Sequence, residues 1–333
     1  MRIPEVKRKR TMGCVALMLV LSSACAFAQS ERHSATCRDQ QSVQPFLGRW
    51  DLTLKTPVRK YPSWLGLSQH NCRLKATIVG RWGGACPASK VDVRGGVLTF
   101  ASPKEGDCDT NVVFKGKLAD GKLEGTATGP KGTPWTWTGE KEPALADETV
   151  SKWGQPIRLF NGKNLDGWHA YSAKESPQSG HWTVVNGLLV SPGQGPELVS
   201  NRKFDNFKLH VEFKLGPTSN SGVYLRGRYE VQIENDSANE APSHHTGGVY
   251  GFIAPHPQLP RTTDQWQTFD ITFIGRQVTV VQNGTTVIDN KEIPGITGGA
   301  LDSQEGQPGP IMLQGSEKGH VSFRNVVITP ALN

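Results

Sequence analysis

Short segments in which apolar and polar residues alternate fill the chain between residues 45 and 141. They cover residues 47–54, 73–79, 90–93, 96–100, 111–117, 122–128 and 133–138. Turn sequences such as Arg94-Gly95-Gly96 separate them. Because side chains of a β-strand point alternately to its two faces, the pattern predicts about seven short strands here. We expect a small antiparallel β-barrel or β-sandwich domain.

A second alternating region runs from residue 157 to residue 331. Clear examples are residues 204–214, 229–234, 266–273, 276–288 and 320–329. Asn186-Gly187 and Asn283-Gly284 are typical of hairpin turns. About ten or more strands without helices predict a two-sheet β-sandwich, or jelly roll. The predicted fold class is therefore all-β, with residues 142–156 as a linker between the two domains.

The sequence NSGVYLRGRYEVQIEND, residues 220–236, predicts a hairpin at the centre of this second region. In its second strand the apolar side chains point to one face and the polar ones to the other: Tyr229, Val231 and Ile233 against Glu230, Gln232 and Glu234. Arg226 and Arg228 stand at the predicted turn. Two carboxylates and an amide beside two arginines favour a site for a polar ligand over an ordinary solvated sheet face.

The first 28 residues have the pattern of a secretory signal peptide. A basic start is followed by an apolar run over residues 14–27, and Ala26-Phe27-Ala28 is typical of the cleavage site. The run is shorter than the roughly 20 apolar residues of a membrane-spanning helix. Lipoprotein anchoring is not favoured, because Ser22 stands where such signals have leucine. We expect a periplasmic or secreted protein, with residues 29–44 as a mobile arm.

Removal of residues 1–28 changes the charge of the chain. The segment carries five basic residues and one acidic residue, so the formal net charge falls from +7 to +3. No later segment clusters Lys and Arg with aromatic residues, as nucleic-acid-binding surfaces do. We therefore expect no nucleic-acid partner.

Four of the six cysteines, Cys37, Cys72, Cys86 and Cys108, follow the predicted cleavage site. An even number in an exported chain predicts two disulfide bonds, with the pairing left open. The wide spacings, without a C-x-x-C pair, speak against a zinc site.

The second region contains eight short sequence motifs. They are FNGKNLDGW, WTVVNGLLV, FDNFKLHVEFK, NSGVYLRGRYEVQI, a W-x-x-F-x-I strand, QNGTTV, GPIMLQ and VSFRNVVI. They resemble the 3-keto-disaccharide hydrolase (3-keto-glucoside 1,2-lyase/hydratase) domain family over residues 157–330. The resemblance implies the concanavalin A-like lectin/glucanase fold, with an active site on the concave face that would carry Glu230, Gln232 and Glu234. The first domain resembles an accessory β domain often fused in front of this one.

The resemblance implies an enzyme that cleaves 3-keto-glycosides. A ketone at sugar carbon 3 acidifies the hydrogen on carbon 2, a base removes it, the group on carbon 1 leaves, and water adds. This chemistry needs a base and a group that stabilises the enolate oxygen. The expected bases are Glu230, His244 or His245. The expected electrophile is Arg226, Arg228 or a divalent metal ion.

Other residues are expected to hold the sugar. The candidates for substrate binding are Asn220, Arg228, Gln232 and Gln314. A divalent metal ion, the one cofactor considered, would be held by Glu230, Glu234 and Asp236 with one histidine.

Two other functions stay open at this point: a non-catalytic, lectin-like carbohydrate-binding protein and a conventional glycoside hydrolase. The E-x-Q-x-E spacing resembles the E-x-D-x-E strand of retaining glucanases with the same fold. Glu230 and Glu234 would lie about 13 Å apart along a strand, whereas a retaining pair lies about 5 Å apart. All three functions predict a carbohydrate partner.

Overall fold

The computed structural model describes residues 40–81, 83–103, 111–129, 132–145, 150–172, 181–234, 240–260, 262–316 and 319–332. Residues Phe46–Asn333 form one compact unit that contains three β-sheets. A short helix, α2 (Gln40–Val43), and a 3-10 turn, η1 (Gln44–Phe46), precede the first strand. The predicted signal peptide lies outside the described residues. The predicted domain boundaries stay predictions, because the compact unit includes both β regions.

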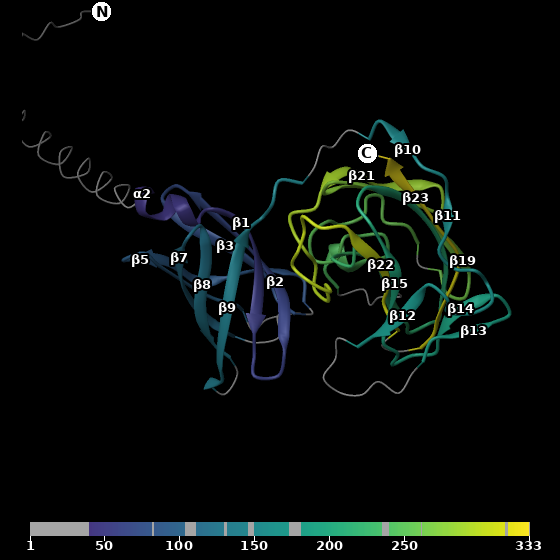
Figure 1. The fold of residues 1–333 in the computed structure, drawn as a ribbon, viewed down its shortest axis with the longest axis horizontal. Coiled ribbons are helices and arrows are strands. Elements are labelled where there is room, and N and C mark those ends of the chain that lie inside the picture. The colour runs from purple at the N-terminus through teal and green to yellow at the C-terminus, as the bar shows by residue number, and fades with distance from the viewer. Residues whose placement is uncertain are drawn as a thin grey trace, which may run out of the picture. The chain divides into compact units, whose positions relative to one another are not determined.

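Nine antiparallel strands form one sheet, here called the N-terminal sheet (Figure 1). They are β1 (Gly48–Lys55), β2 (Lys60–His70), β3 (Arg73–Val79), β4 (Ala85–Pro87), β5 (Ser89–Arg94), β6 (Val97–Ala101), β7 (Val113–Ala119), β8 (Lys122–Thr128) and β9 (Pro134–Lys141). Their order is β4-β3-β2-β1-β9-β8-β7-β6-β5, and β3 also contacts β5. The sheet therefore curls towards closure, as a small barrel does.

Alternation did not predict β2, which contains Pro62. The strand buries neighbouring residues on both of its faces, so that its period of two is hidden. Trp64 packs into the core cluster shared with the later strands, while its neighbour Leu65 is also fully buried. A strand covered on both sides reads as a continuous apolar run.

Aromatic side chains fill the inside of the N-terminal sheet. Phe100 and Phe114 stack with ring centroids 4.6 Å apart, and both meet Trp137 edge-on. A Cβ at Gly116 would overlap the Trp137 indole, so glycine is required there. Trp50 and Trp137 are at most 1% exposed. These tryptophans build a core and not a sugar-stacking surface.

The remaining strands form a two-sheet sandwich, here called the jelly roll. The larger sheet has the order β13-β14-β23-β16-β19-β20-β21, with β10 and β11 also paired to β23. Its strands are β10 (Lys152–Trp153), β11 (Ile157–Arg158), β13 (Thr183–Val185), β14 (Leu188–Ser191), β16 (Phe207–Leu215), β19 (Trp266–Ile274), β20 (Gln277–Gln282), β21 (Thr285–Glu292) and β23 (Val321–Leu332). The smaller sheet has the order β12-β15-β22-β17-β18. Its strands are β12 (Trp168–Tyr171), β15 (Glu197–Phe204), β17 (Asn220–Leu225), β18 (Tyr229–Glu234) and β22 (Gly309–Leu313).

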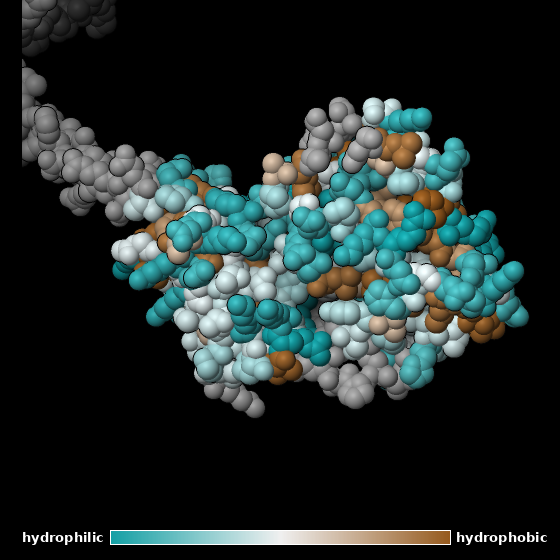
Figure 2. Space-filling model, viewed as in Figure 1, coloured by the Kyte–Doolittle hydropathy of each residue, from teal (hydrophilic) through white to brown (hydrophobic). Residues whose placement is uncertain are grey.

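The core of the jelly roll lies between its two sheets. Phe207, Leu209, Val211 and Phe213 alternate along β16 and face apolar residues of the smaller sheet in one buried cluster. The all-β fold class, a jelly roll preceded by a barrel-like sheet, is confirmed. On the side shown in Figure 2, hydrophobic residues form small separate groups within a largely hydrophilic surface.

Two further findings concern membrane-spanning helices and disulfide bonds. Within the described part of the chain, no helix has the length and apolar character needed to cross a bilayer. Cys72 and Cys86 each take part in a disulfide bond. Cys37 and Cys108 lie outside the described residues, so the two predicted disulfide bonds stay a prediction.

Candidate active site

The hairpin of β17 and β18 presents its polar side chains on one face of the smaller sheet. Its register pairs Asn220 with Glu234, Gly222 with Gln232, and Tyr224 with Glu230. Directly opposite residues of an antiparallel pair point to the same side. The intervening apolar side chains of β18 are fully buried in the core cluster on the other side. The predicted hairpin and its two faces are therefore confirmed, and we call the first of them the polar face.

Glu230 is buried on the polar face and held by Tyr224. The side chain is 3% exposed. The Tyr224 hydroxyl lies 2.8 Å from Oε2 of Glu230 and 2.9 Å from the carbonyl oxygen of Gly298, and can donate its proton to either. Burial, and next the charge of Glu230, raise the pKa of Tyr224 well above its usual range. The phenol therefore stays protonated and acts as a donor that orients the carboxylate.

Gly222 provides the space that the Glu230 carboxylate fills. A Cβ at this position would overlap Oε1 of Glu230. The glycine sits inside β17, where it weakens the strand and where a close approach is a common reason for it. We did not predict this role from the sequence, although a glycine within an alternating strand is the signal that could have shown it.

Three amide side chains, those of Asn220, Gln232 and Gln314, lie on the polar face with Glu230. Gln232 Nε2 donates to Oε2 of Glu234 at 3.0 Å. Gln314 follows β22, and its backbone nitrogen donates to the carbonyl oxygen of Gly222 at 2.9 Å. Oδ1 of Asn220 and Oε1 of Gln314 are buried and have no hydrogen-bond partner among the described residues. Buried acceptors of this kind are costly unless something donates to them, so both oxygens are suited to substrate hydroxyls.

A further carboxylate, Glu197, lies on the same face. Strand pairing places Val199 and Tyr224 on either side of Met312, and Glu197 is two residues before Val199. Glu197 is 5% exposed, and its Oε2 accepts from the backbone nitrogen of Gly315 at 2.9 Å. Sequence reasoning missed this residue, because the first half of β15 is buried on both sides and shows no alternation.

The two histidines predicted as bases lie at different places. His244 ends the 3-10 turn η3 (Pro242–His244), is 8% exposed and stacks on Tyr250 with ring centroids 4.2 Å apart. The backbone nitrogen of Tyr250 donates to the carbonyl oxygen of Glu230 at 3.1 Å. His245 lines a small pocket with Glu234 and Gln282. The structure therefore brings His244 towards Glu230 near the start of β18, and His245 towards Glu234 at its end.

The two arginines of the hairpin turn bind carboxylates from other loops. Arg226 is 1% exposed; Nη1 donates to Oδ1 of Asp205 at 2.9 Å and Nη2 to the carbonyl oxygen of Gly275 at 2.6 Å. Nε of Arg228 donates to Oδ1 of Asp302 at 2.7 Å. These hydrogen bonds brace the turn, and the expectation that the guanidinium groups stabilise an enolate oxygen stays a prediction.

The metal site expected at Glu230, Glu234 and Asp236 stays a prediction, because the structure describes only two of these three residues. No three His, Cys, Asp or Glu side chains there are grouped so that they could hold a metal. Glu234 accepts from Gln232, and Glu230 accepts from Tyr224. Asp236, the third expected ligand, lies outside the described residues. We derive no step through a metal ion.

Comparison with known proteins assigns a family to the second region. The model of the 3-keto-alpha-glucoside-1,2-lyase-like domain matches residues 155–329. A 3-keto-disaccharide hydrolase of Bacteroides thetaiotaomicron is 23% identical, and the match covers 40% of this chain and 57% of that protein. The chain thus spans a little over half the length of this curated relative.

Solved structures give weaker matches. A candidate glycosyl hydrolase from Parabacteroides distasonis is 27% identical with a TM-score of 0.43, covering 56% of this chain and 93% of that one. An endo-β-1,3(4)-glucanase is 10% identical with a TM-score of 0.35, covering 57% and 95%. The family match over residues 155–329 takes in the whole polar face, and the chain belongs to the family of 3-keto-alpha-glucoside-1,2-lyase-like domains.

Proposed function

We propose that this protein is a glycoside-cleaving enzyme that acts on 3-keto-glycosides, with Glu230 as the base. Family membership and the name of the relative support the substrate class. The observation that carries the proposal is the placement of Glu230, which is buried on the polar face, oriented by Tyr224 and given room by Gly222. A catalytic base must be fixed within reach of the proton that it removes.

The reaction starts at carbon 2 of the keto sugar. Glu230 takes the proton from carbon 2, and the electron pair forms an enolate with the carbon 3 ketone. The ketone re-forms as the bond from carbon 1 to the aglycone oxygen breaks, and that oxygen takes a proton from solvent. Water then adds at carbon 1, releasing one proton, and Glu230 returns its proton to carbon 2. Asn220, Gln232 and Gln314 hold the sugar through its hydroxyl groups.

Turnover of nitrophenyl 3-keto-glucoside beside its unoxidised parent tests this proposal. We expect the protein to cleave the keto compound alone, because without the ketone the carbon 2 hydrogen is too weakly acidic. Cleavage of the parent would instead identify a conventional glycoside hydrolase. Binding of both sugars without turnover would identify a lectin-like protein. A parallel assay with a chelator shows whether a metal ion takes part.

The variant Glu230→Gln separates the base from general folding. We expect about 10²- to 10⁴-fold lower turnover, the usual contribution of a general base, with unchanged melting temperature. Glu124→Gln is the matched control, because Glu124 is exposed on β8 of the N-terminal sheet. Equal turnover of the two variants would rule out Glu230 as the base.

We also propose that the protein is exported to the periplasm or beyond. The pattern of residues 1–28 and the even number of later cysteines support this location. Amino-terminal sequencing of the protein from its native cell is expected to begin at Gln29. Recovery of the chain with residues 1–28 intact would contradict the proposal.

A further inference from the structure

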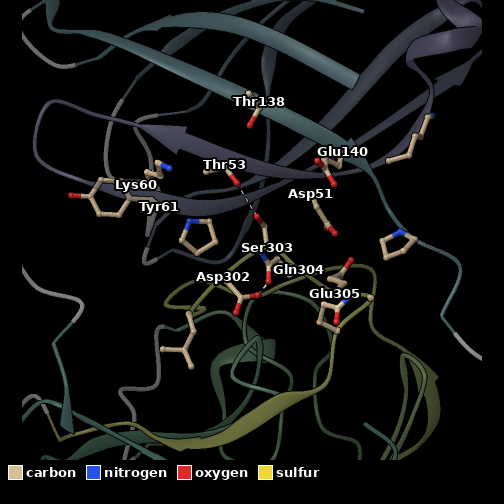
Figure 3. A pocket seen from close by; sticks show the side chains of 16 residues that line it. Asp51, Thr53, Lys60, Tyr61, Thr138, Glu140, Asp302, Ser303, Gln304 and Glu305 are labelled. Carbon is tan, nitrogen blue, oxygen red and sulfur yellow. Dashed lines mark hydrogen bonds between the residues drawn. The ribbon is translucent and has the colours of Figure 1, made fainter. Parts of the chain in front are cut away.

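A large cavity lies away from Glu230, between the N-terminal sheet and one loop of the jelly roll. Its volume is about 810 Å³. Strands β1, β2 and β9 line one side, and residues 301–307 line the other (Figure 3). Pockets for small molecules measure about 300–1,000 Å³. The cavity is therefore large enough for a sugar ring or a disaccharide.

The lining consists mainly of hydroxyl, carboxyl and amide groups. The register of β1 and β9 pairs Asp51 with Glu140 and Thr53 with Thr138, so these side chains form two adjacent rows. From the opposite side, Ser303 reaches Thr53 with their hydroxyl oxygens 3.0 Å apart. Such a lining offers many donors and acceptors to a ligand that has many hydroxyl groups.

Asp51 points into the cavity with an unsatisfied oxygen. The residue is 6% exposed, and its Oδ1 has no hydrogen-bond partner in the described ranges. A buried polar atom without a partner is uncommon and calls for a ligand or water to satisfy it. Figure 3 shows the side chain directed from β1 towards Gln304 and Glu305.

Glu305, across from Asp51, is fixed by its other neighbours. It is fully buried; Oε1 accepts from the Tyr229 hydroxyl at 2.6 Å, and Oε2 accepts from Arg276 Nη2 at 2.9 Å. Burial, and next the charge of Glu305 and a hydrogen bond between the two carboxyl groups, raise the pKa of Asp51 to about 9. Asp51 is therefore protonated at neutral pH and shares its proton with Glu305, so that Oδ1 is left as an acceptor for a ligand hydroxyl.

The charges of the lining select the class of ligand. Four acidic residues and two lysines line the cavity. One of the lysines, Lys141, is already engaged, since its Nζ donates to the carbonyl oxygen of Leu47 and lies over the Trp50 ring. Among the acids, Glu305 is paired with Arg276, Asp302 with Arg228, and Asp51 is protonated. The lining therefore carries little uncompensated charge, which suits an uncharged ligand, and its described residues offer no arginine fork for phosphate. A metal ion is not favoured either, because the described acids and histidines do not group as ligands.

We propose that this cavity is a second carbohydrate-binding site, which takes an uncharged saccharide of one or two rings through Asp51, Thr138, Ser303 and Gln304. The family match begins at residue 155, so the half of the site that comes from β1, β2 and β9 belongs to this chain's own N-terminal sheet. The site needs no chemical step and does not depend on the reaction proposed at Glu230.

Calorimetric titration of the full chain with maltose, cellobiose and trehalose tests this site. The test variant is Thr138→Trp, which fills the cavity from a half-buried position on β9. The control is Thr136→Trp, on the same face of the same strand but exposed and outside the lining. We expect at least one disaccharide to bind wild type and Thr136→Trp alike, and Thr138→Trp to bind it at least tenfold more weakly.

Turnover and melting temperature are measured beside binding, to separate a change in the cavity from a change at Glu230 or in folding. Turnover of the 3-keto-glucoside is expected to be equal in all three proteins, so that a defect at Glu230 cannot be mistaken for one in the cavity. If Thr138→Trp lowers the melting temperature, Gln304→Trp, on an exposed loop position of the lining, replaces it. The proposal is overturned if none of the three sugars binds wild type, if the cavity-filling variant binds as wild type does, or if glucose 6-phosphate binds more tightly than the neutral sugars.

Discussion

A Cβ placed on Gly84 would lie 3.1 Å from Nε2 of His244. Gly84 comes from the loop between β3 and β4 of the N-terminal sheet, and His244 stacks on Tyr250 beside the strand of Glu230. The same Cβ would lie 3.0 Å from the Cα of Gly251. The N-terminal sheet therefore packs closely against the loop that carries His244 and takes part in shaping the candidate active site.

The change Gly84→Ala tests this contact. The added methyl group has two neighbours at distances tighter than most real contacts, so we expect the loop with His244 and Tyr250 to shift by a few tenths of an ångström. Small misplacements near reacting groups cost much activity, and we expect a roughly tenfold lower kcat/KM on the 3-keto-glucoside. The matched control is Gly80→Ala, because a Cβ there meets no atom within 4 Å. Equal kcat/KM values would show that the contact does not matter for turnover.

Tyr224→Phe removes the phenol that orients Glu230. The Tyr224 hydroxyl can donate to Oε2 of Glu230 or to the carbonyl oxygen of Gly298, and the variant lacks this donor. We expect kcat to fall about tenfold or more with little change in KM, since the change acts on the orientation of the base. The unfolding free energy should fall by about 1–3 kcal/mol, the usual cost of a buried polar group left without its partner. A higher KM at unchanged kcat would instead make Tyr224 a substrate-binding residue.

Gly222→Ala should abolish turnover for a steric reason. The new Cβ and the Glu230 carboxylate cannot occupy the same space, so Glu230 must adopt another rotamer or β17 must move. We expect at least about 10²-fold lower kcat, similar to the loss of a general base. Gly80→Ala, where a Cβ meets no atom within 4 Å, controls for the replacement of a glycine. Wild-type turnover by Gly222→Ala would mean that the position of Glu230 is not critical.

The polar face illustrates what sequence alone can predict. The alternation in β18 separates Tyr229, Val231 and Ile233 from Glu230, Gln232 and Glu234, and the register confirms this division. Such a prediction succeeds because the two faces of a strand follow from local geometry. Glu197 was missed because the first half of its strand is buried on both sides, so that apolar and polar residues do not alternate there.

The partners of the turn arginines could not be predicted in the same way. Asp205 and Asp302, which bind Arg226 and Arg228, lie 21 and 74 positions away in the chain. Composition and spacing show that charged groups are near a turn, but they do not show which distant loop folds back onto it. The cavity lined by Asp51 and Glu305 has the same origin, since its two sides come from segments about 160 to 250 residues apart.

Arg226→Met tests the structural role of this arginine. Removal of the guanidinium leaves Asp205 and the buried carbonyl oxygen of Gly275 without their donor. We expect the unfolding free energy to fall by about 2–3 kcal/mol, less than for a fully buried pair because Asp205 is partly exposed. Turnover per folded molecule is expected to change little. A loss of turnover without a loss of stability would instead support the predicted catalytic role of Arg226.

Asp51→Asn tests the buried carboxyl pair through the pH dependence of stability. The folded-state pKa of Asp51 is raised to about 9 by burial and by Glu305, far above the value of about 3.9 expected in the unfolded chain. A raised pKa means that the folded state binds the proton more tightly, so its stabilising contribution is complete below about pH 4 and is lost as pH rises through about 9. Asparagine resembles the protonated acid and removes this dependence. We expect the variant to melt about 2–4 °C above wild type at pH 8, equivalent to about 1 kcal/mol.

Glu142 also contributes to the pH dependence of stability in both proteins, because its pKa is raised to about 7, chiefly by burial. Because Glu142 remains in the variant, stability should still decline as pH rises towards 7 and then level off, whereas wild type should continue to decline up to about pH 9. The measurement is the melting temperature of both proteins from pH 5 to pH 9.5. Parallel curves for the two proteins over the whole range would show that Asp51 is ionised in the folded state, and the buried carboxyl of the cavity would then lack the proton that it shares with Glu305.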